Sequence, residues 1–214
     1  MEENKKHLDD LLHIRSMMER SSRFLSLSGL SGVFAGIYAI IGAAIVYFDF
    51  QAGSLTYSEY VRSTAGAENQ DKKLMFLVAI ALMVLLSSLV TGYLFTSRKA
   101  KKQGLKIWDK SAKRMMLNLF FPLFAGGVLC LVMMHHGLLG MVAPLTLIFY
   151  GLGLYGSSKY SFVELKYLGI SEVLLGLASA YFYGKGLLFW TIGFGLLHII
   201  YGSLMYFKYE KPAK

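Results

Sequence analysis

The chain has 214 residues, of which 55% are hydrophobic and 16% are charged, and its mean hydropathy is +0.50. Charged residues make up about 25% of ordinary soluble domains, so this composition excludes that class and indicates an all-α, polytopic membrane helix bundle. The net charge of +9 does not indicate a nucleic-acid partner, because the Lys and Arg residues cluster in short connections between apolar runs.

Residues 1–23 are predicted to form an amphipathic helix on the cytoplasmic side of a membrane. Leu8, Leu11 and Leu12 fall at helical spacing, and Arg15 and Glu19 form a four-residue ion pair. Such a helix either anchors the first membrane span or binds a cytoplasmic protein, and the sequence leaves both uses open.

Six apolar runs follow, each long enough to cross a bilayer. They predict a transmembrane domain over residues 24–207, with a cytoplasmic tail at 208–214; the spans are 24–48, 74–95, 115–134, 138–155, 165–183 and 187–207. Eighteen of the 22 Lys and Arg residues then fall on one side. The positive-inside rule makes that side cytoplasmic, and both termini lie on it.

Small residues in three of these spans predict close contacts between helices. Gly29, Gly32 and Gly36 follow one another at three- and four-residue spacing in the first span, and Gly176 and Gly202 lie in the last two. Glycines at such spacing let helix backbones approach each other, either within one protomer or across a homo-oligomer.

The segment 96–114 carries eight Lys and Arg residues against one acid, Asp109. This bias predicts a cytoplasmic loop, and the loop is also a candidate contact for anionic lipid headgroups or a protein partner. The candidate contact residues are Lys101, Lys102, Lys106, Trp108 and Lys110.

Glu172 and His198 are the two ionisable residues that the sequence places deep in the membrane. Glu172 lies roughly 10 Å along the fifth span and His198 roughly 13 Å from the end of the sixth, at the helical rise of 1.5 Å per residue. Because the spans are antiparallel, we expect the two side chains at similar depth, with Tyr201 as a further polar partner. Intramembrane ionisable residues are functional candidates, but a neutral pair that only joins two helices is an equal alternative.

The sequence indicates no metal or cofactor. His135 and His136 are adjacent at the end of the third span, but no carboxylate or cysteine is near them in sequence. Metal centres in proteins usually have three or four ligands, so we expect a polar turn at this place.

Two short segments repeat within the chain. Residues 29–37 match residues 169–177 at four of nine positions, and 150–155 resembles 201–206. Both matches keep the same direction across the membrane, which favours a helical hairpin used three times about an axis along the membrane normal. With glycine-rich span starts such as Ser28–Gly32, this plan resembles small bacterial six-span membrane proteins of the HdeD acid-stress type. The resemblance implies a bacterial inner-membrane location, and no functional residues carry over from it.

Three functions remain open. The expected one is a non-catalytic sensor, stress-response or assembly component. The alternative is a small-solute or proton-coupled transporter that uses Glu172 and His198 as a relay. An intramembrane enzyme is the third, but the sequence shows no nucleophile with an obvious base and no clustered carboxylates.

Overall fold

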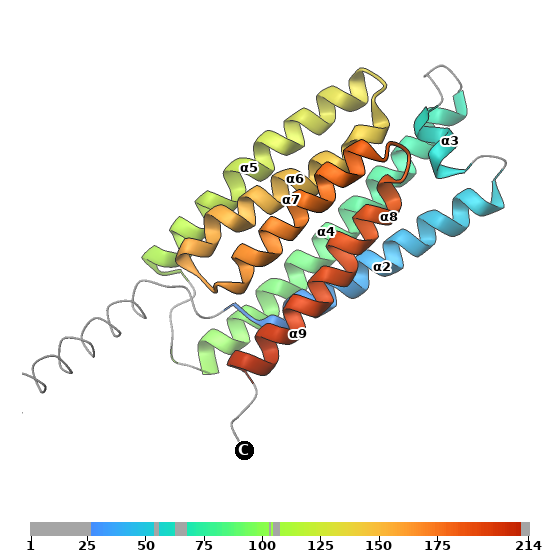
Figure 1. Cartoon of the computed structure of the whole chain (residues 1–214). Coiled ribbons are helices and arrows are strands. Elements are labelled where there is room, and N and C mark those ends of the chain that lie inside the picture. Colours follow the sequence, from blue (N-terminus) through green and yellow to red (C-terminus); the bar gives the residue numbers. More distant parts are fainter. Residues whose placement is uncertain (1–26, 54–55, 63–67, 103, 105–107, 211–214) are drawn as a thin grey trace, which may run out of the picture.

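The computed structural model describes residues 27–53, 56–62, 68–102, 104 and 108–210, and these contain helices and turns but no strand (Figure 1). The amphipathic helix predicted at 1–23 lies outside the described residues. The long helices are α2 (Gly29–Ala52), α4 (Glu68–Lys102), α5 (Lys110–His135), α6 (Val142–Ser157), α7 (Glu164–Tyr181) and α9 (His198–Tyr209). Short helices are α3 (Tyr57–Arg62), η1 (Leu139–Met141), η2 (Ser158–Tyr160), α8 (Gly186–Trp190) and the π-helix η3 (Thr191–Leu197).

Within the part of the chain that the structure describes, five helical segments are long and apolar enough to cross a membrane: Gly29–Ala52, Lys72–Lys102, Lys110–His135, Leu139–Tyr160 and Gly186–Tyr209. The fifth predicted span, α7, is not among them, because its 18 residues include Glu164, Lys166 and Glu172. The chain is thus a helical protein with several potential membrane spans.

The outer surface of the bundle is apolar, as expected of helices that face hydrocarbon. Helix α4 packs mainly along α2 and leaves its large apolar side chains exposed. Examples are Met75, Leu82, Met83, Leu86, Leu89 and Val90. Lipid chains are as apolar as these side chains, so no protein partner is needed to cover them.

The basic segment differs from the predicted loop. Helix α4 continues to Lys102 and α5 begins at Lys110, so Lys101, Lys102 and Lys110 lie on helix ends rather than in a long loop. Asp109 caps α5, since its carboxylate accepts a hydrogen bond of 2.6 Å from the backbone N–H of Ala112. Lys and Arg are good helix formers, which extends both helices beyond their apolar parts.

Helices α5, α6 and α7 lie side by side in sequence order, and α9 packs against α2 (Figure 1). The α2–α9 contact joins elements from opposite ends of the chain. Gly29 and Gly202 make this close contact possible: a Cβ on Gly29 would lie 2.5 Å from the Gly202 carbonyl oxygen, and one on Gly202 would lie 2.7 Å from that of Gly29. In the same way, a Cβ on Gly32 would lie 3.3 Å from Gly202 Cα.

The α6–α7 pair packs through glycines at the same aligned positions as the α2–α9 pair. A Cβ on Gly169 would lie 2.6 Å from the Gly151 carbonyl oxygen. In the sequence alignment of 29–37 with 169–177 and of 150–155 with 201–206, this is the counterpart of the Gly29–Gly202 contact.

The α2–α9 and α6–α7 pairs also match one helical turn or more further along α2 and α7. Gly36 faces the carbonyl oxygen of Gly195 and the backbone nitrogen of Ile199, at 2.5 and 3.0 Å from its ideal Cβ. Gly176 faces the corresponding atoms of Pro144 and Ile148, at 2.9 and 3.0 Å. The threefold hairpin repeat stays a prediction, because α4 does not pair with a neighbour in this way: Gly92 has no atom within 4 Å of its ideal Cβ.

Candidate functional site

Glu172 is buried at the centre of the bundle. Its side chain on α7 has no exposed surface, and neither carboxylate oxygen has a hydrogen-bond partner among the described residues. The nearest ionisable atom is His198 Nδ1, 3.5 Å from Glu172 Oε1. An unpaired polar group in an apolar interior is costly, so a buried acid without hydrogen bonds is a site that needs an explanation.

Gly193 provides the space for the acid. A Cβ at this position would lie 2.5 Å from Glu172 Oε2 and 2.5 Å from a methyl group of Leu147. Any larger residue at position 193 therefore requires the carboxylate or Leu147 to move.

His198 has a hydrogen-bond partner on each ring nitrogen. Nδ1 lies 3.0 Å from the Gly193 carbonyl oxygen, and Nε2 lies 2.7 Å from the Tyr150 hydroxyl. A carbonyl oxygen can only accept, so Nδ1 carries the proton and donates to Gly193. In the neutral ring, Nε2 then accepts from the Tyr150 O–H.

The backbone before His198 is unusual. Residues Thr191–Leu197 form a π-helix, which joins α8 to α9. Short π-helical turns are frequent at functional sites. Here the turn contains Gly193 and Phe194, and the ring centroids of Phe194 and Tyr150 lie 5.1 Å apart, with that of His198 5.4 Å from Tyr150. These rings cover the imidazole with apolar surface.

This arrangement has two charge states that differ by the position of one proton. In one, a protonated Glu172 lies beside a neutral His198; in the other, a carboxylate lies beside an imidazolium. Buried ion pairs and their neutral counterparts are commonly close in free energy, because desolvation offsets much of the Coulomb attraction. Moving between these two states transfers the proton from one residue to the other and leaves the net charge unchanged. Uptake or release of a proton involves a third state, in which a carboxylate lies beside a neutral His198.

Ser179 is a second buried polar group on the same helix. It lies seven residues after Glu172, so both share one face of α7, and its hydroxyl is also without a hydrogen-bond partner among the described residues. The two side chains are about two helical turns, or roughly 10 Å, apart.

Of the three residues that the sequence singled out, the structure brings Glu172 and His198 together. Tyr201 instead packs against an apolar cluster that includes Leu168 and Met205. The tyrosine that contacts His198 is Tyr150, which sequence reasoning missed. The repeat contained the signal, because Tyr150 is the counterpart of Tyr201 in the alignment of 150–155 with 201–206.

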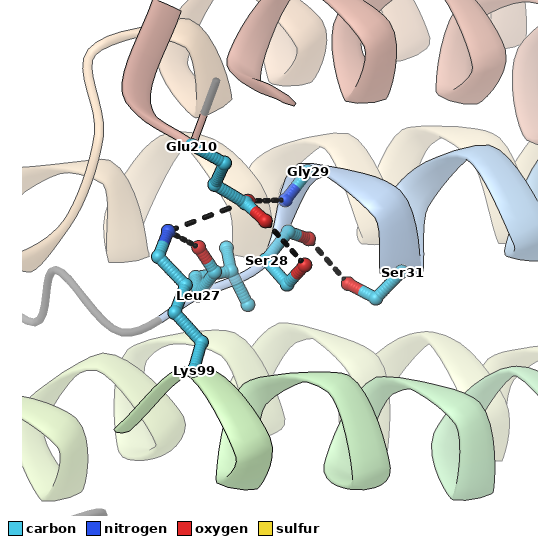
Figure 2. Close-up of polar contacts among 6 residues, drawn as sticks. All are labelled: Leu27, Ser28, Gly29, Ser31, Lys99 and Glu210. Carbon is cyan, nitrogen blue, oxygen red and sulfur yellow. Dashed lines mark hydrogen bonds and ion pairs between the residues drawn. The ribbon is translucent and has the colours of Figure 1, made fainter. Parts of the chain in front are cut away.

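A second polar cluster joins the end of α9 to the start of α2 and the end of α4 (Figure 2). We refer to it as the clasp; its members are Leu27, Ser28, Gly29, Ser31, Lys99 and Glu210. One Glu210 oxygen accepts from the Gly29 backbone N–H at 2.5 Å, and the other accepts from the Ser28 hydroxyl at 3.1 Å. A carboxylate is favourable here, because the first N–H groups of a helix have no partner within it.

Lys99 completes the clasp from α4. Its ammonium donates to the Leu27 carbonyl oxygen at 2.7 Å and lies 3.3 Å from Glu210 Oε1. The Lys99 and Glu210 side chains are only 10% and 14% exposed, so this ion pair is much less screened than a surface pair. Sequence reasoning missed the clasp, since its hydrogen bonds join residues up to 182 positions apart.

A third polar contact lies beside the clasp, where α9 meets α7. Lys208 donates to Glu164 Oε1 at 2.6 Å, and the Tyr209 hydroxyl lies 3.0 and 3.1 Å from the two carboxylate oxygens. Burial alone would raise the pKa of the Glu164 carboxyl. Hydrogen bonds from Lys208, its own backbone and Tyr209 outweigh burial, and the pKa lies below its ordinary value.

The residues predicted to contact lipid headgroups are exposed where the structure describes them. Lys101, Lys102, Trp108 and Lys110 all have exposed side chains, whereas Lys106 lies outside the described residues. The lipid or partner contact itself stays a prediction.

Across the described ranges, no three His, Cys, Asp or Glu side chains are grouped closely enough to hold a metal ion. Comparison of the chain with models of known protein families, with curated proteins and with solved structures gave no match.

Proposed function

We propose that this chain is a non-catalytic, multi-pass membrane sensor in which the buried Glu172–His198 pair binds and releases a proton. The observation that carries the proposal is the environment of Glu172. Both of its oxygens are buried without a hydrogen bond, 3.5 Å from a histidine nitrogen. A carboxyl group that served only to join helices would be expected to use its oxygens in hydrogen bonds.

The six-span arrangement with both termini in the cytoplasm is part of the proposal. Helix α7 is the fifth of these six spans, because it packs along α6 and its inward-facing Glu172 is covered by protein rather than by lipid. Most Lys and Arg residues, including the exposed Lys101, Lys102 and Lys110, then lie on the cytoplasmic side. The corresponding location is a bacterial inner membrane.

Anionic lipid headgroups are the proposed ligands of the basic helix ends. Exposed Lys side chains and Trp108, a residue that is 61% exposed, suit the headgroup layer. Each Lys or Arg near an anionic surface contributes about 1 kcal/mol to such binding.

Infrared spectroscopy of the protein in nanodiscs tests the proton site directly. We expect a carboxylic-acid carbonyl band that changes between about pH 5 and 8, the range in which histidine titrates, and that Glu172→Gln abolishes. His198→Gln should remove the pH dependence while keeping a constant band. Glu164→Gln is the matched control, since it removes a carboxylate that lies at the end of the bundle. A Glu172 band that stays constant over this range in the unmutated protein contradicts the proposal.

A proton-coupled transporter is the second candidate. It is favoured by Ser179, whose buried hydroxyl also lacks a hydrogen-bond partner among the described residues and lies on the Glu172 face of α7. Together they provide two polar groups for a proton or solute path. Proton flux in liposomes discriminates between the two functions. Flux that is lost in both Glu172→Gln and Ser179→Ala, while both variants stay folded, establishes a transporter. A protein whose Glu172 band titrates but that shows no flux is a sensor.

A further inference from the structure

We infer that the clasp is the cytoplasmic output of the buried Glu172–His198 pair, and that α9 connects the two. The inference rests on the proposed proton site and adds its regulation. His198 is the first residue of α9 and Glu210 is its C-cap, so one helix carries a residue of each cluster. A displacement of α9 at His198 therefore also displaces Glu210 in the clasp.

The start of α9 has a reason to move when His198 is protonated. In the described structure, Nδ1 donates to the Gly193 carbonyl at 3.0 Å and lies 3.5 Å from Glu172 Oε1. A charged imidazolium gains more from a carboxylate than from a neutral carbonyl, and such charge-assisted hydrogen bonds are about 2.7–2.9 Å long. When an ionised Glu172 faces a neutral His198 and the pair takes up one proton, the resulting imidazolium draws His198 and the start of α9 toward α7.

The backbone around His198 permits this movement. The π-helix Thr191–Leu197 lies immediately before α9 and can alter its turn without breaking the helix. On the other side, α9 contacts α2 closely at Gly202, whose ideal Cβ would lie 2.7 Å from the Gly29 carbonyl oxygen. Small shifts at such packed interfaces are commonly amplified into a change between two discrete arrangements.

The clasp has the properties of a releasable contact. Glu210 accepts from Gly29 and Ser28, and Lys99 reaches both Glu210 and the Leu27 carbonyl. Hydrogen bonds depend steeply on geometry, so a displaced Glu210 loses the α2 N-terminus and the Lys99 ammonium together. Release frees Leu27, the point from which residues 1–26 continue on the proposed cytoplasmic side.

The charged and titratable groups around these residues are few. Tyr150 from α6 and Glu172 from α7 face His198, whereas Gly29, Gly32 and Gly36, through which α2 contacts this part of the chain, carry no titratable group. At the clasp, Glu210 faces Lys99 from α4. Glu164 from α7 faces Lys208 and Tyr209 next to it.

Pulsed electron–electron resonance on the full chain in nanodiscs tests the coupling. Spin labels are placed at Lys102→Cys on α4 and Leu204→Cys on α9, both exposed, in a Cys130→Ala background because Cys130 is the one cysteine of the sequence. Between about pH 8 and pH 5, where histidine titrates, we expect the ratio of long to short label distances to rise about tenfold, a typical allosteric coupling.

The variants separate the clasp from the proton site. Glu210→Gln should give the long distance at both pH values, and His198→Gln the short distance at both. Glu164→Gln is the matched control, because it removes the other polar contact of the same helix end and should keep the pH response. Melting temperatures identify any variant that fails to fold, and Lys99→Met then replaces Glu210→Gln.

The infrared band of Glu172, recorded on the same samples, distinguishes the two possible failures. A band that titrates together with the label distance supports the inference. A band that titrates while the distance stays constant overturns the role of the clasp and leaves the proton sensor standing. A band that does not titrate overturns the proton sensor, and with it the inference that rests on it.

Discussion

Gly193 makes room for a buried acid, because the Glu172 carboxylate occupies the volume in which a side chain at position 193 would lie. We expect Gly193→Ala to lower the free energy of unfolding by about 1–3 kcal/mol, the usual cost of overpacking a core. The cost should be smaller in a Glu172→Ala background, since the new methyl group then meets only Leu147 at 2.5 Å. Thermal unfolding in detergent measures both values.

Gly127 supplies the matched control for this prediction. It lies inside α5 with no atom within 4 Å of its ideal Cβ. Gly127→Ala should leave stability unchanged or raise it by up to about 1 kcal/mol, because alanine has the better helix propensity. Equal losses for the two variants would show that the substitution, rather than the space around Glu172, causes the effect.

Glu164 gives a pH dependence with a definite sign. Its pKa is lowered in the folded state, so its ionised form stabilises the fold at neutral pH, and this contribution is lost as the pH falls through the folded-state pKa. We expect Glu164→Gln to lower the free energy of unfolding by about 0.5–1 kcal/mol at pH 7, since Lys208 is largely exposed. Below the ordinary glutamate pKa of about 4.3 the difference from the unmutated protein should shrink toward zero. A difference that grows in acid would show that another group carries the effect.

Helices α2, α6, α7 and α9 hold together through glycines that face backbone atoms. Gly202→Ala would place a methyl group 2.7 Å from the Gly29 carbonyl oxygen, and Gly151→Ala would place one 2.5 Å from that of Gly169. Backbone cannot rotate away as a side chain can, so we expect each variant to lose about 2 kcal/mol or more of stability. Gly92→Ala, inside α4 with open space around its ideal Cβ, should be neutral. Unfolding in detergent compares all three, and a loss at Gly92 would indicate that α4 is covered in the membrane.

The helices themselves were readable from the sequence, because long apolar runs leave few alternatives to a helix in lipid. The candidate packing glycines Gly29, Gly32, Gly36, Gly176 and Gly202 all lie against neighbouring helices in the structure. Their partners were not predictable, since periodicity gives the face of a helix and not the helix that it meets. Lys101, Lys102 and Lys110 show a different limit: charge locates a segment outside hydrocarbon but does not end a helix.

The candidate site could be predicted in part from the sequence. The depth of Glu172 and His198 follows from their distance to the span ends, so their proximity could be anticipated. Gly193 and Tyr150 could not be selected in the same way. The role of Gly193 depends on the π-helix, which has no clear sequence signal, and Tyr150 depends on which helices become neighbours.

Helices α2 and α9 are far apart in the chain but adjacent in space. The clasp joins them. Between α6 and α7, the covalent connection 158–163 joins a helix pair at one end. Between α9 and α2, which cross in the same register, Glu210 and the α2 N-terminus make that connection by hydrogen bonds. Each long helix is therefore joined to the next, by the covalent chain within the sequence and by the hydrogen bonds of the clasp between α9 and α2.

A circularly permuted chain tests this view of the whole molecule. Glu210 is joined to Leu27 by about four glycine or serine residues, which span roughly 10 Å, and new ends are placed at Gly104. Gly104 is exposed and has no atom within 4 Å of its ideal Cβ, so opening the chain there disturbs no packing. We expect the permuted protein to insert and to melt within a few degrees of the original, because every helix contact is retained. Glu210→Gln should also cost less in the permuted chain, since the linker keeps α9 beside α2 when the clasp is lost. If the permuted chain inserts but melts many degrees below the original, the clasp does more than hold two ends together, and the packing of α9 must depend on residues 1–26 as well.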